Sequence, residues 1–323
     1  MKKELLQRVL RCFMVCFLVT LLIGCGKANE SSLTASFDAS MEVPEAKVEQ
    51  ETLMASELSV FDPDVITEEF PEVYAALLAD ETTGEAILGE HVYDKFYPAS
   101  ITKIFTAYMA LKYADLDDTV TVSYRASHIT TWGAQLCKLE EGDQINMKNL
   151  LEAMLCYSGN DTSIAIAEHI SGSVEDFCDQ MNEEARKLGC VNTHLVNPHG
   201  LHEDDHYTSA YDIYLVMREL MKDERFREMD NAPKAVLHIT HANGETEDRE
   251  FVATNRYFNG EVEMPKNVEL IGGKTGTTSQ AGYCLVLGST GKESGDLYIS
   301  VILHAKNKDR LYQYMTELLA NAK

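Results

Sequence analysis

The chain has 323 residues, with 28 lysines and arginines against 52 aspartates and glutamates, so its formal net charge at pH 7 is −24. Such an acidic chain lacks the basic surface that binding to phosphates needs, which argues against nucleic acid as a partner. The same acidity argues against a protein that lies flat on an anionic membrane.

The first 24 residues have the pattern of an export signal. Four basic residues precede an uncharged apolar run at 12–23, which is short for a bilayer because a membrane-crossing helix needs about 20 residues. The run ends in Leu22-Ile23-Gly24-Cys25, which resembles a bacterial lipobox with Cys25 as the lipidated first mature residue. A short membrane anchor with an incidental cysteine is the alternative. Either way, we expect an extracytoplasmic protein attached to the membrane by its N-terminus.

Residues 25–72 are predicted to form an acidic, disordered tether. Between residues 26 and 72, twelve acidic residues stand against Lys27 and Lys47, and no hydrophobic periodicity is sustained. A segment of this composition cannot bury enough apolar surface to offset the entropy that folding costs. We therefore place the folded domain at 73–323, which is long enough to build one large core.

Hydrophobic patterns in this domain predict strands at both ends and helices between them. Apolar runs at 73–79 and 86–88, separated by Thr83-Gly84, predict a buried hairpin. Apolar residues spaced by three and four predict helices at 100–112, 147–155, 161–170, 174–188 and 209–222. Strands are predicted at 269–273, 282–288 and 297–304, and a final helix at 309–322. This order indicates an α+β fold with one antiparallel sheet and a helical subdomain inserted at about 115–235.

The first candidate for chemistry is Ser100-Ile101-Thr102-Lys103, which places a hydroxyl and an amine on one face of a predicted helix. Serine is a poor nucleophile until a base takes its proton. Lysine is such a base only when burial or a neighbouring cation lowers its pKa. Apolar residues after Lys103 offer the burial, and Lys274 offers the cation. Taken alone, the motif is more typical of a helix-capping serine beside a solvated lysine.

A second candidate, Ser158-Gly159-Asn160, follows the predicted helix at 147–155. By itself it is an ordinary turn, in which the glycine ends one helix and Asp161 caps the next. In the functional interpretation, Ser158 relays a proton between the two lysines and a leaving amine. Asn160 then holds Lys103 and the amide of a substrate.

The strongest motif is Lys274-Thr275-Gly276-Thr277, which lies in a predicted strand rich in glycine. Glycines in a strand often mark where a ligand or another backbone comes close. An extended peptide can then lie beside the strand as an added edge, with its terminal carboxylate on Lys274 and Thr275. A glycine-rich edge strand with a surface lysine is the alternative.

Three histidines between residues 199 and 206 have the look of a metal site. Zinc needs ligands that converge from defined spacings, whereas Gly200 and the acidic residues that follow it are typical of a solvated loop. We therefore predict a loop before the next helix and no metal site. The serine and lysine chemistry needs no cofactor.

Together and in this order, the three motifs resemble those of the penicillin-binding serine D-Ala-D-Ala carboxypeptidases of peptidase family S11. The resemblance runs from about Val73 to the C-terminus. It implies the fold shared by β-lactamases and DD-peptidases. It also implies a Ser100 acyl-enzyme formed with stem peptides of peptidoglycan or with β-lactam antibiotics such as penicillin. The extra C-terminal β domain and amphipathic anchor helix of many members are expected to be missing.

The resemblance also assigns roles to residues of this chain. The expected catalytic residues are Ser100, Lys103, Ser158 and Asn160. The expected substrate-binding residues are Lys274, Thr275, Gly276 and Thr277. The backbone N–H groups of Ser100 and Thr277 are expected to form the oxyanion hole.

Two other functions stay open at this point. The first is a β-lactamase on the same fold. Against it, Gly159 stands where a class A β-lactamase would carry aspartate, and no Glu-x-x-Leu-Asn loop follows Asn160. The second is a non-catalytic receptor for wall peptide or β-lactam, and the intact set of nucleophile and base counts against it.

Overall fold

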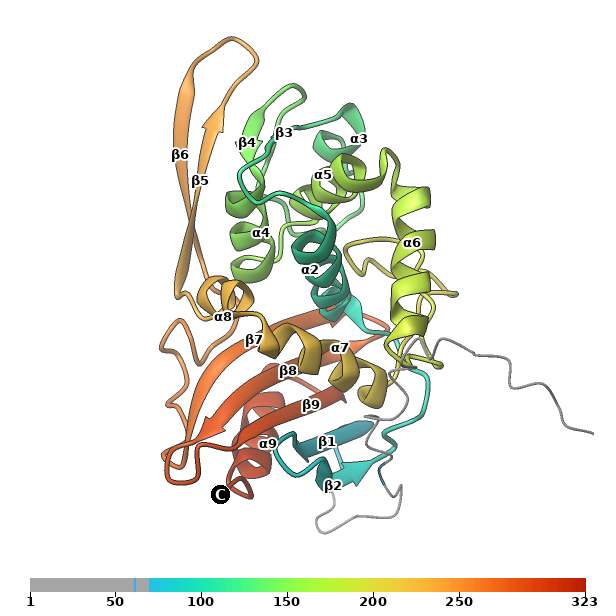
Figure 1. Ribbon diagram of the computed structural model, residues 1–323, viewed down its shortest axis with the longest axis vertical. Coiled ribbons are helices and arrows are strands. Elements are labelled where there is room, and N and C mark those ends of the chain that lie inside the picture. The colour runs from blue at the N-terminus through green and yellow to red at the C-terminus, as the bar shows by residue number, and fades with distance from the viewer. Residues whose placement is uncertain (1–60, 62–69) are drawn as a thin grey trace, which may run out of the picture. The chain divides into compact units, whose positions relative to one another are not determined.

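The computed structural model describes Phe61 and residues 70–323 (Figure 1). The predicted export signal at 1–24, the predicted lipidation site Cys25 and most of the predicted tether at 25–72 lie outside the described residues. In the part of the chain that is described, no helix has the length and apolar character to cross a membrane.

The sheet expected from the two ends of the domain is present, with five antiparallel strands in the order β2-β1-β9-β8-β7. Its strands are β1 (Ala75–Asp80), β2 (Glu85–Glu90), β7 (Val268–Thr278), β8 (Gly282–Gly291) and β9 (Leu297–Ala305). The predicted hairpin is formed by β1 and β2. Because β9 pairs with both β1 and β8, it joins this N-terminal hairpin to the C-terminal strands. Strand β7 lies at one edge of the sheet.

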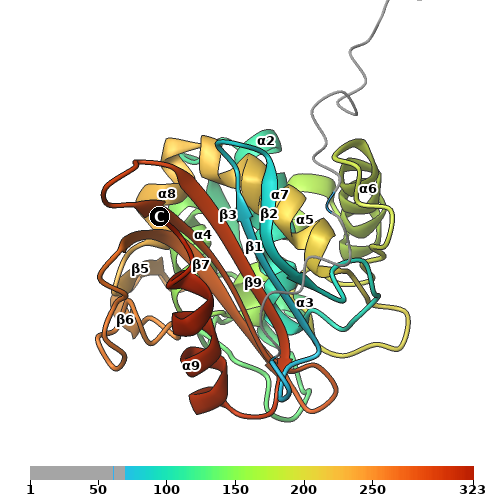
Figure 2. The same ribbon diagram turned by 90° about the horizontal axis from the view of Figure 1, so that it is seen from below.

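Alternate residues of the central strands face two separate cores, as the period of a strand requires. Along β1, Leu77 packs in the larger core, whereas Ala76 and Leu78 pack in the smaller core on the opposite face. Figure 2 shows helix α7 (Ala210–Lys222) on one side of the sheet and helix α9 (Lys308–Leu319) on the other. Since both faces are buried, these strands read in the sequence as continuous apolar runs.

The remaining predicted helices complete the larger core. They are α2 (Thr102–Tyr113), which follows the short 3-10 helix η2 (Ala99–Ile101), then α4 (Met147–Cys156), α5 (Asn160–Ser171) and α6 (Val174–Lys187). Helix α2 is buried along most of its length, and its buried residues include the polar Thr102, Lys103 and Thr106. Buried polar groups need partners inside the protein, so α2 brings polar side chains to an interior site.

A second sheet was not predicted. It has four antiparallel strands in the order β3-β4-β5-β6. Its strands are β3 (Thr119–Thr121), β4 (Gln144–Asn146), β5 (Lys234–Thr240) and β6 (Thr246–Val252), and two short helices, α3 (Tyr124–Ser127) and α8 (Glu224–Asp230), lie in the same stretch of chain. The expectation of a single sheet was therefore wrong. Strands of three residues, such as β3 and β4, are too short to show a periodic pattern.

Candidate active site

Ser100 lies in η2, directly before α2, and its half-buried side chain lines a cleft. The preceding Ala99 has a φ of 48°, in the left-handed region that residues other than glycine seldom adopt. The Thr102 hydroxyl holds this backbone by donating a 2.8 Å hydrogen bond to the carbonyl oxygen of Ala99. The backbone directly before the serine is thus strained, and the first residue of the following helix holds it in place.

Thr102 is fixed in turn by His206. The Val196 N–H donates to His206 Nδ1 at 3.0 Å, so the neutral ring carries its proton on Nε2. Nε2 lies 2.7 Å from the Thr102 hydroxyl and donates to it. Burial lowers the pKa of His206 to about 3, which keeps the ring neutral. The histidine therefore supports the serine turn through a chain of hydrogen bonds.

Lys103, on the first turn of α2, is fully buried and has three partners. Its Nζ lies 3.1 Å from Ser100 Oγ, 2.7 Å from Asn160 Oδ1 and 2.7 Å from the backbone oxygen of His199. Burial, and then the charge of Lys274, hold the pKa of Lys103 well below its ordinary value. The structure thus brings Ser100, Lys103 and Asn160 together around one amine.

The partners of Lys103 decide where its lone pair points. A neutral amine has two N–H donors and one lone pair, and the oxygens of Asn160 and His199 can only accept. The two N–H groups are therefore used on these oxygens. The lone pair is left for the hydroxyl of Ser100, which is the orientation that a general base needs.

The second buried lysine, Lys274 on β7, lies against the second serine. Its Nζ donates to Ser158 Oγ at 3.0 Å and to the backbone oxygen of Thr275 at 3.1 Å. Ser158, between α4 and α5, has a φ of 73°. Burial lowers the pKa of Lys274 to about 8, although the carboxyl of Asp230 opposes this effect. Ser100 and Ser158 thus each lie within hydrogen-bond distance of a different buried lysine.

Strand β7 reaches the serine because it has glycine at position 276. A methyl group on Gly276 would lie 2.8 Å from the carbonyl oxygen of Pro98 and 3.1 Å from Ser100 N. Contacts this short leave room only for glycine. Next to it, the Thr275 hydroxyl is held by the Thr254 hydroxyl at 2.7 Å.

The cleft in front of the two serines has a volume of about 360 Å³. The predicted residues that line it are Ser100, Ser158, Asn160, Thr275, Gly276 and Thr277, while Lys103 and Lys274 are buried behind them. The sequence did not single out Gln135, Thr254 or Lys308, which also line the cleft. Among its described lining residues, Lys308 is the only one with a formal charge. Its place at the start of α9 gave no signal in the sequence.

The histidine-rich segment at 199–206 contacts this site through its backbone. The backbone oxygen of His199 holds Lys103, and a methyl group on Gly200 would lie 1.8 Å from the carbonyl oxygen of Ala99. Within residues 70–323 and Phe61, no group of three or more histidines, cysteines or carboxylates is placed to hold a metal ion. The sequence predicted a loop here, but it did not predict the contacts of this loop with Lys103 and Ala99.

A serine beside a buried lysine, in a cleft at the edge of an antiparallel sheet, has the arrangement of a nucleophile next to its base. The family profile described as D-alanyl-D-alanine carboxypeptidase matches residues 66–307. The carboxypeptidase DacF of Bacillus subtilis is 32% identical over 255 residues, which are 77% of this chain and 61% of that protein. For DacC of Escherichia coli the identity is 33% over 270 residues, 80% of this chain and 62% of that protein.

The chain therefore belongs to the D-alanyl-D-alanine carboxypeptidase family, peptidase family S11. It spans about three fifths of the length of these curated relatives.

Solved structures agree on the fold. A Streptomyces DD-transpeptidase superposes with a TM-score of 0.72 at 22% identity, covering 79% of this chain and 98% of that one. The D-alanyl-D-alanine carboxypeptidase DacD of Francisella tularensis gives a TM-score of 0.67 at 25% identity, covering 80% of this chain and 71% of that one. The predicted α+β fold of the DD-peptidase type is confirmed.

Proposed function

We propose that the protein is a serine-type D-Ala-D-Ala carboxypeptidase that removes the terminal D-alanine from stem peptides of peptidoglycan. The observation that carries this proposal is the set of contacts around Lys103 Nζ, which aims its lone pair at the Ser100 hydroxyl. Family membership supplies the substrate class. The cleft supplies the room for an extended peptide beside β7.

In the first step, neutral Lys103 takes the proton of Ser100, and Ser100 Oγ attacks the carbonyl carbon of the penultimate D-alanine. The negative oxygen of the tetrahedral intermediate accepts hydrogen bonds from the backbone N–H groups of Ser100 and Thr277. Gly276 supports this arrangement, because it lets the backbone of β7 lie against η2. Asn160 keeps Lys103 in place during the transfer.

In the second step, the peptide bond breaks and the nitrogen of the departing D-alanine takes a proton through Ser158. The proton that Lys103 took from Ser100 makes up for this one, so that Lys103 is neutral again before water attacks. The carboxylate of the departing residue binds to Thr275 and Lys274, and the charge of Lys308 on the cleft wall attracts it further. Water then hydrolyses the ester and restores the Ser100 hydroxyl.

The proposal extends to β-lactams and to location. Penicillin carries a reactive carbonyl and a carboxylate, so it would acylate Ser100 in the same orientation as the peptide. Lipidation of Cys25 would attach the enzyme to the outer face of the cell membrane, because two acyl chains suffice for stable anchoring. The acidic residues at 25–72 would then hold the domain away from the membrane.

The experiment is to follow the mass of the intact protein after penicillin is added. We expect a single stable adduct that is absent in Ser100→Ala and present in Ser127→Ala, which changes a serine outside the cleft. An adduct that forms briefly while penicillin is consumed catalytically would instead indicate a β-lactamase. Folded protein without any adduct would indicate the non-catalytic receptor.

A second measurement tests the substrate. A peptide that ends in D-Ala-D-Ala should release free D-alanine, and the same peptide ending in L-Ala-L-Ala should not. Release should stop in Ser100→Ala and after treatment with penicillin. A stable penicillin adduct without release of D-alanine from any stem peptide would contradict the proposed substrate.

A further inference from the structure

A second cavity, with a volume of about 600 Å³, adjoins the cleft, and none of the steps above uses it. Three stretches of chain line both spaces. The segment at 128–135 lines the cavity with its first half and the cleft with its second half. On helix α5, Asn160 lines the cleft and Ile164, one turn further along, lines the cavity, while Leu201 lines both. A ligand too long for the cleft can therefore continue into the cavity.

The boundary between the two spaces is a turn with an exposed tryptophan. The Ala134 N–H donates to the Thr131 oxygen at 3.1 Å, and Gly133 has a φ of 79°, as a tight turn requires. Trp132, the only tryptophan of the chain, lies inside this turn and is 97% exposed. Its ring takes no part in the core, so its apolar surface can cover a ligand that crosses the turn.

The second cavity also contains a hydrogen-bond donor that the protein leaves unused. The ring of His199 lines the cavity and is 9% exposed. The Leu201 N–H donates to His199 Nδ1 at 3.1 Å, so the neutral ring carries its proton on Nε2. Burial, and then the charge of Lys103, hold the pKa of His199 well below its ordinary value, which keeps the ring neutral.

Nε2 of His199 has no hydrogen-bond partner among the described residues. A donor in such a buried position is costly when it stays unpaired. The cavity therefore suits a ligand that brings an acceptor oxygen to this N–H group.

The rest of the lining indicates what carries that oxygen. Much of it is apolar, from the side chains of Ile129, Ile164, Val196 and Leu201. Arg125 and Glu203 are the only described lining residues with a formal charge, and their charges are opposite. Arg125 is moreover paired with Glu175 at 2.9 Å. Since no net charge dominates, the shape favours an aliphatic chain and the His199 N–H selects its polar end.

We propose that this cavity is a binding subsite for the substrate residue that precedes the D-Ala-D-Ala pair. The side chain of that residue is aliphatic along its length and ends in an oxygen that accepts a hydrogen bond from His199 Nε2. Trp132 covers the substrate where it passes from the cleft to the cavity. This inference rests on the proposed function and adds a specificity determinant to it.

The test compares two peptides of the form acetyl-X-D-Ala-D-Ala. In one, X is L-aminoadipate, whose aliphatic side chain ends in a carboxylate; in the other, X is L-norleucine, which has a side chain of similar length without oxygen. We expect kcat/KM for release of D-alanine to favour the aminoadipyl peptide by about tenfold, the usual effect of a hydrogen bond to a charged group.

His199→Phe keeps a ring of similar size and removes the donor, so the ratio of the two kcat/KM values should fall to about one. A variant that slows both peptides by the same factor and keeps the ratio would show that the ring has only a structural role, and would overturn the proposal. So would a wild type that prefers the norleucyl peptide, or one that prefers a lysyl peptide, whose amine brings further donors to the His199 N–H.

Thr130→Tyr tests the cavity without changing a buried residue. Thr130 is exposed and lines the cavity, so a larger side chain there should obstruct it while the protein still folds. We expect kcat/KM for the aminoadipyl peptide to fall by about tenfold, with little change for acetyl-Gly-D-Ala-D-Ala, which has no side chain to place in the subsite. Thr121→Tyr, exposed on β3 and outside both spaces, is the control and should behave like the wild type. Equal rates in Thr130→Tyr and the control would count against the subsite.

Calorimetric titration of Ser100→Ala with the same peptides measures binding without turnover. The aminoadipyl peptide should bind about tenfold more tightly than the norleucyl peptide, and equal affinities would overturn the subsite alone. If the wild type releases D-alanine from no peptide, the proposed function fails, and this titration still decides whether the cavity binds the side chain. Absence of binding by both peptides would overturn the subsite together with the proposed substrate.

Discussion

At the scale of single residues, the proposed chemistry depends on a lysine that is neutral when it meets the serine. Lys103 meets this condition through burial and through the nearby charge of Lys274, and its donors are taken up by two oxygens that only accept. An arginine in its place would keep a positive charge and a long side chain, but it could not lose its proton.

We therefore expect Lys103→Arg to fold and to be acylated by penicillin about 10²- to 10⁴-fold more slowly, the usual contribution of a general base. The rate is measured by stopped-flow or by quenched mass spectrometry. Lys112→Arg, on the exposed part of the same helix, is the control and should react like the wild type. An arginine variant within threefold of the wild type would show that Lys103 is not the base.

Gly276 is the second residue whose replacement tests the site. In Gly276→Ala the added methyl would lie 2.8 Å from the carbonyl oxygen of Pro98, so β7 must move away from η2. We expect a stability loss of about 1–3 kcal/mol, typical of overpacking, and a loss of acylation by about 10²-fold, typical of misplaced reacting groups.

Gly295→Ala is a control that should lose a similar amount of stability. Gly295 has a φ of 77° with open space around it, so alanine there loses about 1–2 kcal/mol through backbone strain alone. Thermal melting gives the stability of both variants, and the acylation rate should fall only in Gly276→Ala. Equal rates in the two variants would mean that the approach of β7 to η2 does not matter for the chemistry.

At the scale of helices and strands, the sequence predicted the long elements well because their ends carry local signals. The predicted helices at 174–188 and 209–222 agree with α6 and α7 to within one residue. Each follows a serine, Ser173 or Ser209, whose hydroxyl accepts a hydrogen bond from an N–H of the first turn. Amphipathic spacing and a capping residue together locate such a helix without any knowledge of the tertiary fold.

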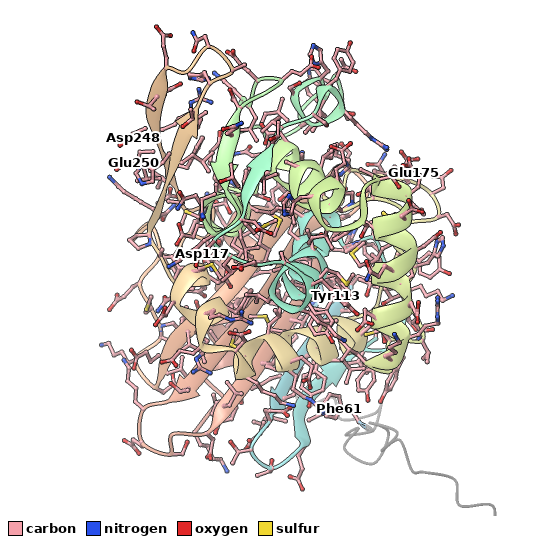
Figure 3. All side chains as sticks on the ribbon, turned by 45° about the horizontal axis from the view of Figure 1, so that its top comes forward. Phe61, Tyr113, Asp117, Glu175, Asp248 and Glu250 are labelled. Carbon is pink, nitrogen blue, oxygen red and sulfur yellow. The ribbon has the colours of Figure 1, made fainter. Side chains whose placement is uncertain are left out.

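The hairpin of β5 and β6 was missed for a physical reason. Asp248 and Glu250, labelled in Figure 3, lie exposed along β6 and alternate with the partly buried Arg249 and the buried Phe251. The strand thus has the period of two, but few of its residues are apolar, so a search for hydrophobic alternation passes over it. Charged residues on an exposed edge strand are common because they discourage aggregation.

At the candidate site, too, sequence patterns indicate only contacts between residues that are close in the chain. The spacing of Ser100 and Lys103 is local, so the sequence could place them together. The contact of Lys103 with the His199 oxygen, and that of Asp230 with the Gly273 N–H, join segments 96 and 43 residues apart. Such contacts depend on how the whole core packs, and no residue type or spacing in one segment indicates them.

One side chain of strand β6 contacts the loop that leads to the cleft. Arg249 Nη1 donates to the backbone oxygens of Cys137 at 2.6 Å and Lys138 at 2.9 Å, at the end of the loop that carries Gln135. The backbone oxygen of Gln135 accepts a hydrogen bond from the Asn160 N–H at 2.8 Å. The second sheet therefore holds one wall of the cleft.

We expect Arg249→Leu to loosen this wall and to slow acylation by about tenfold, since small displacements of groups that position a substrate carry losses of this order or larger. Lys234→Leu, which removes an exposed ion pair with Glu250 on the same hairpin, is the control and should leave the rate unchanged. The same rate in Arg249→Leu and wild type would show that the loop keeps its place without the arginine.

At the scale of the whole domain, the site is assembled from four stretches of chain: η2 with the start of α2, the turn before α5, the loop at 197–201 and the middle of β7. Each stretch is held by buried polar contacts rather than by apolar packing alone. The ring of His206 supports the first of these stretches as a neutral group through its contact with Thr102. The folded state of the whole domain is therefore sensitive to acid at this position.

His206 makes this sensitivity measurable. Its pKa in the folded protein is about 3, mainly because of burial and then because of His194, His202 and Lys103, whereas an unfolded histidine has a pKa of about 6.5. Between these values the unfolded chain binds the proton and the folded one does not, so acid favours unfolding and stability rises with pH. From pH 6.5 to pH 5 this histidine should account for a loss of about 2 kcal/mol.

His206→Gln cannot take up this proton, so its free energy of unfolding should depend less on pH than that of the wild type. Above pH 7 the wild type should be the more stable, because His206 keeps both of its hydrogen bonds; on acidification the difference should shrink by about 2 kcal/mol. Chemical denaturation at pH 7.5 and pH 5 measures it, with the exposed His238→Gln as control. A difference that stays constant across this range would mean that His206 takes up the proton as readily in the folded protein as in the unfolded chain, and the hydrogen-bond chain through Thr102 to Ala99 would then need a different arrangement of protons.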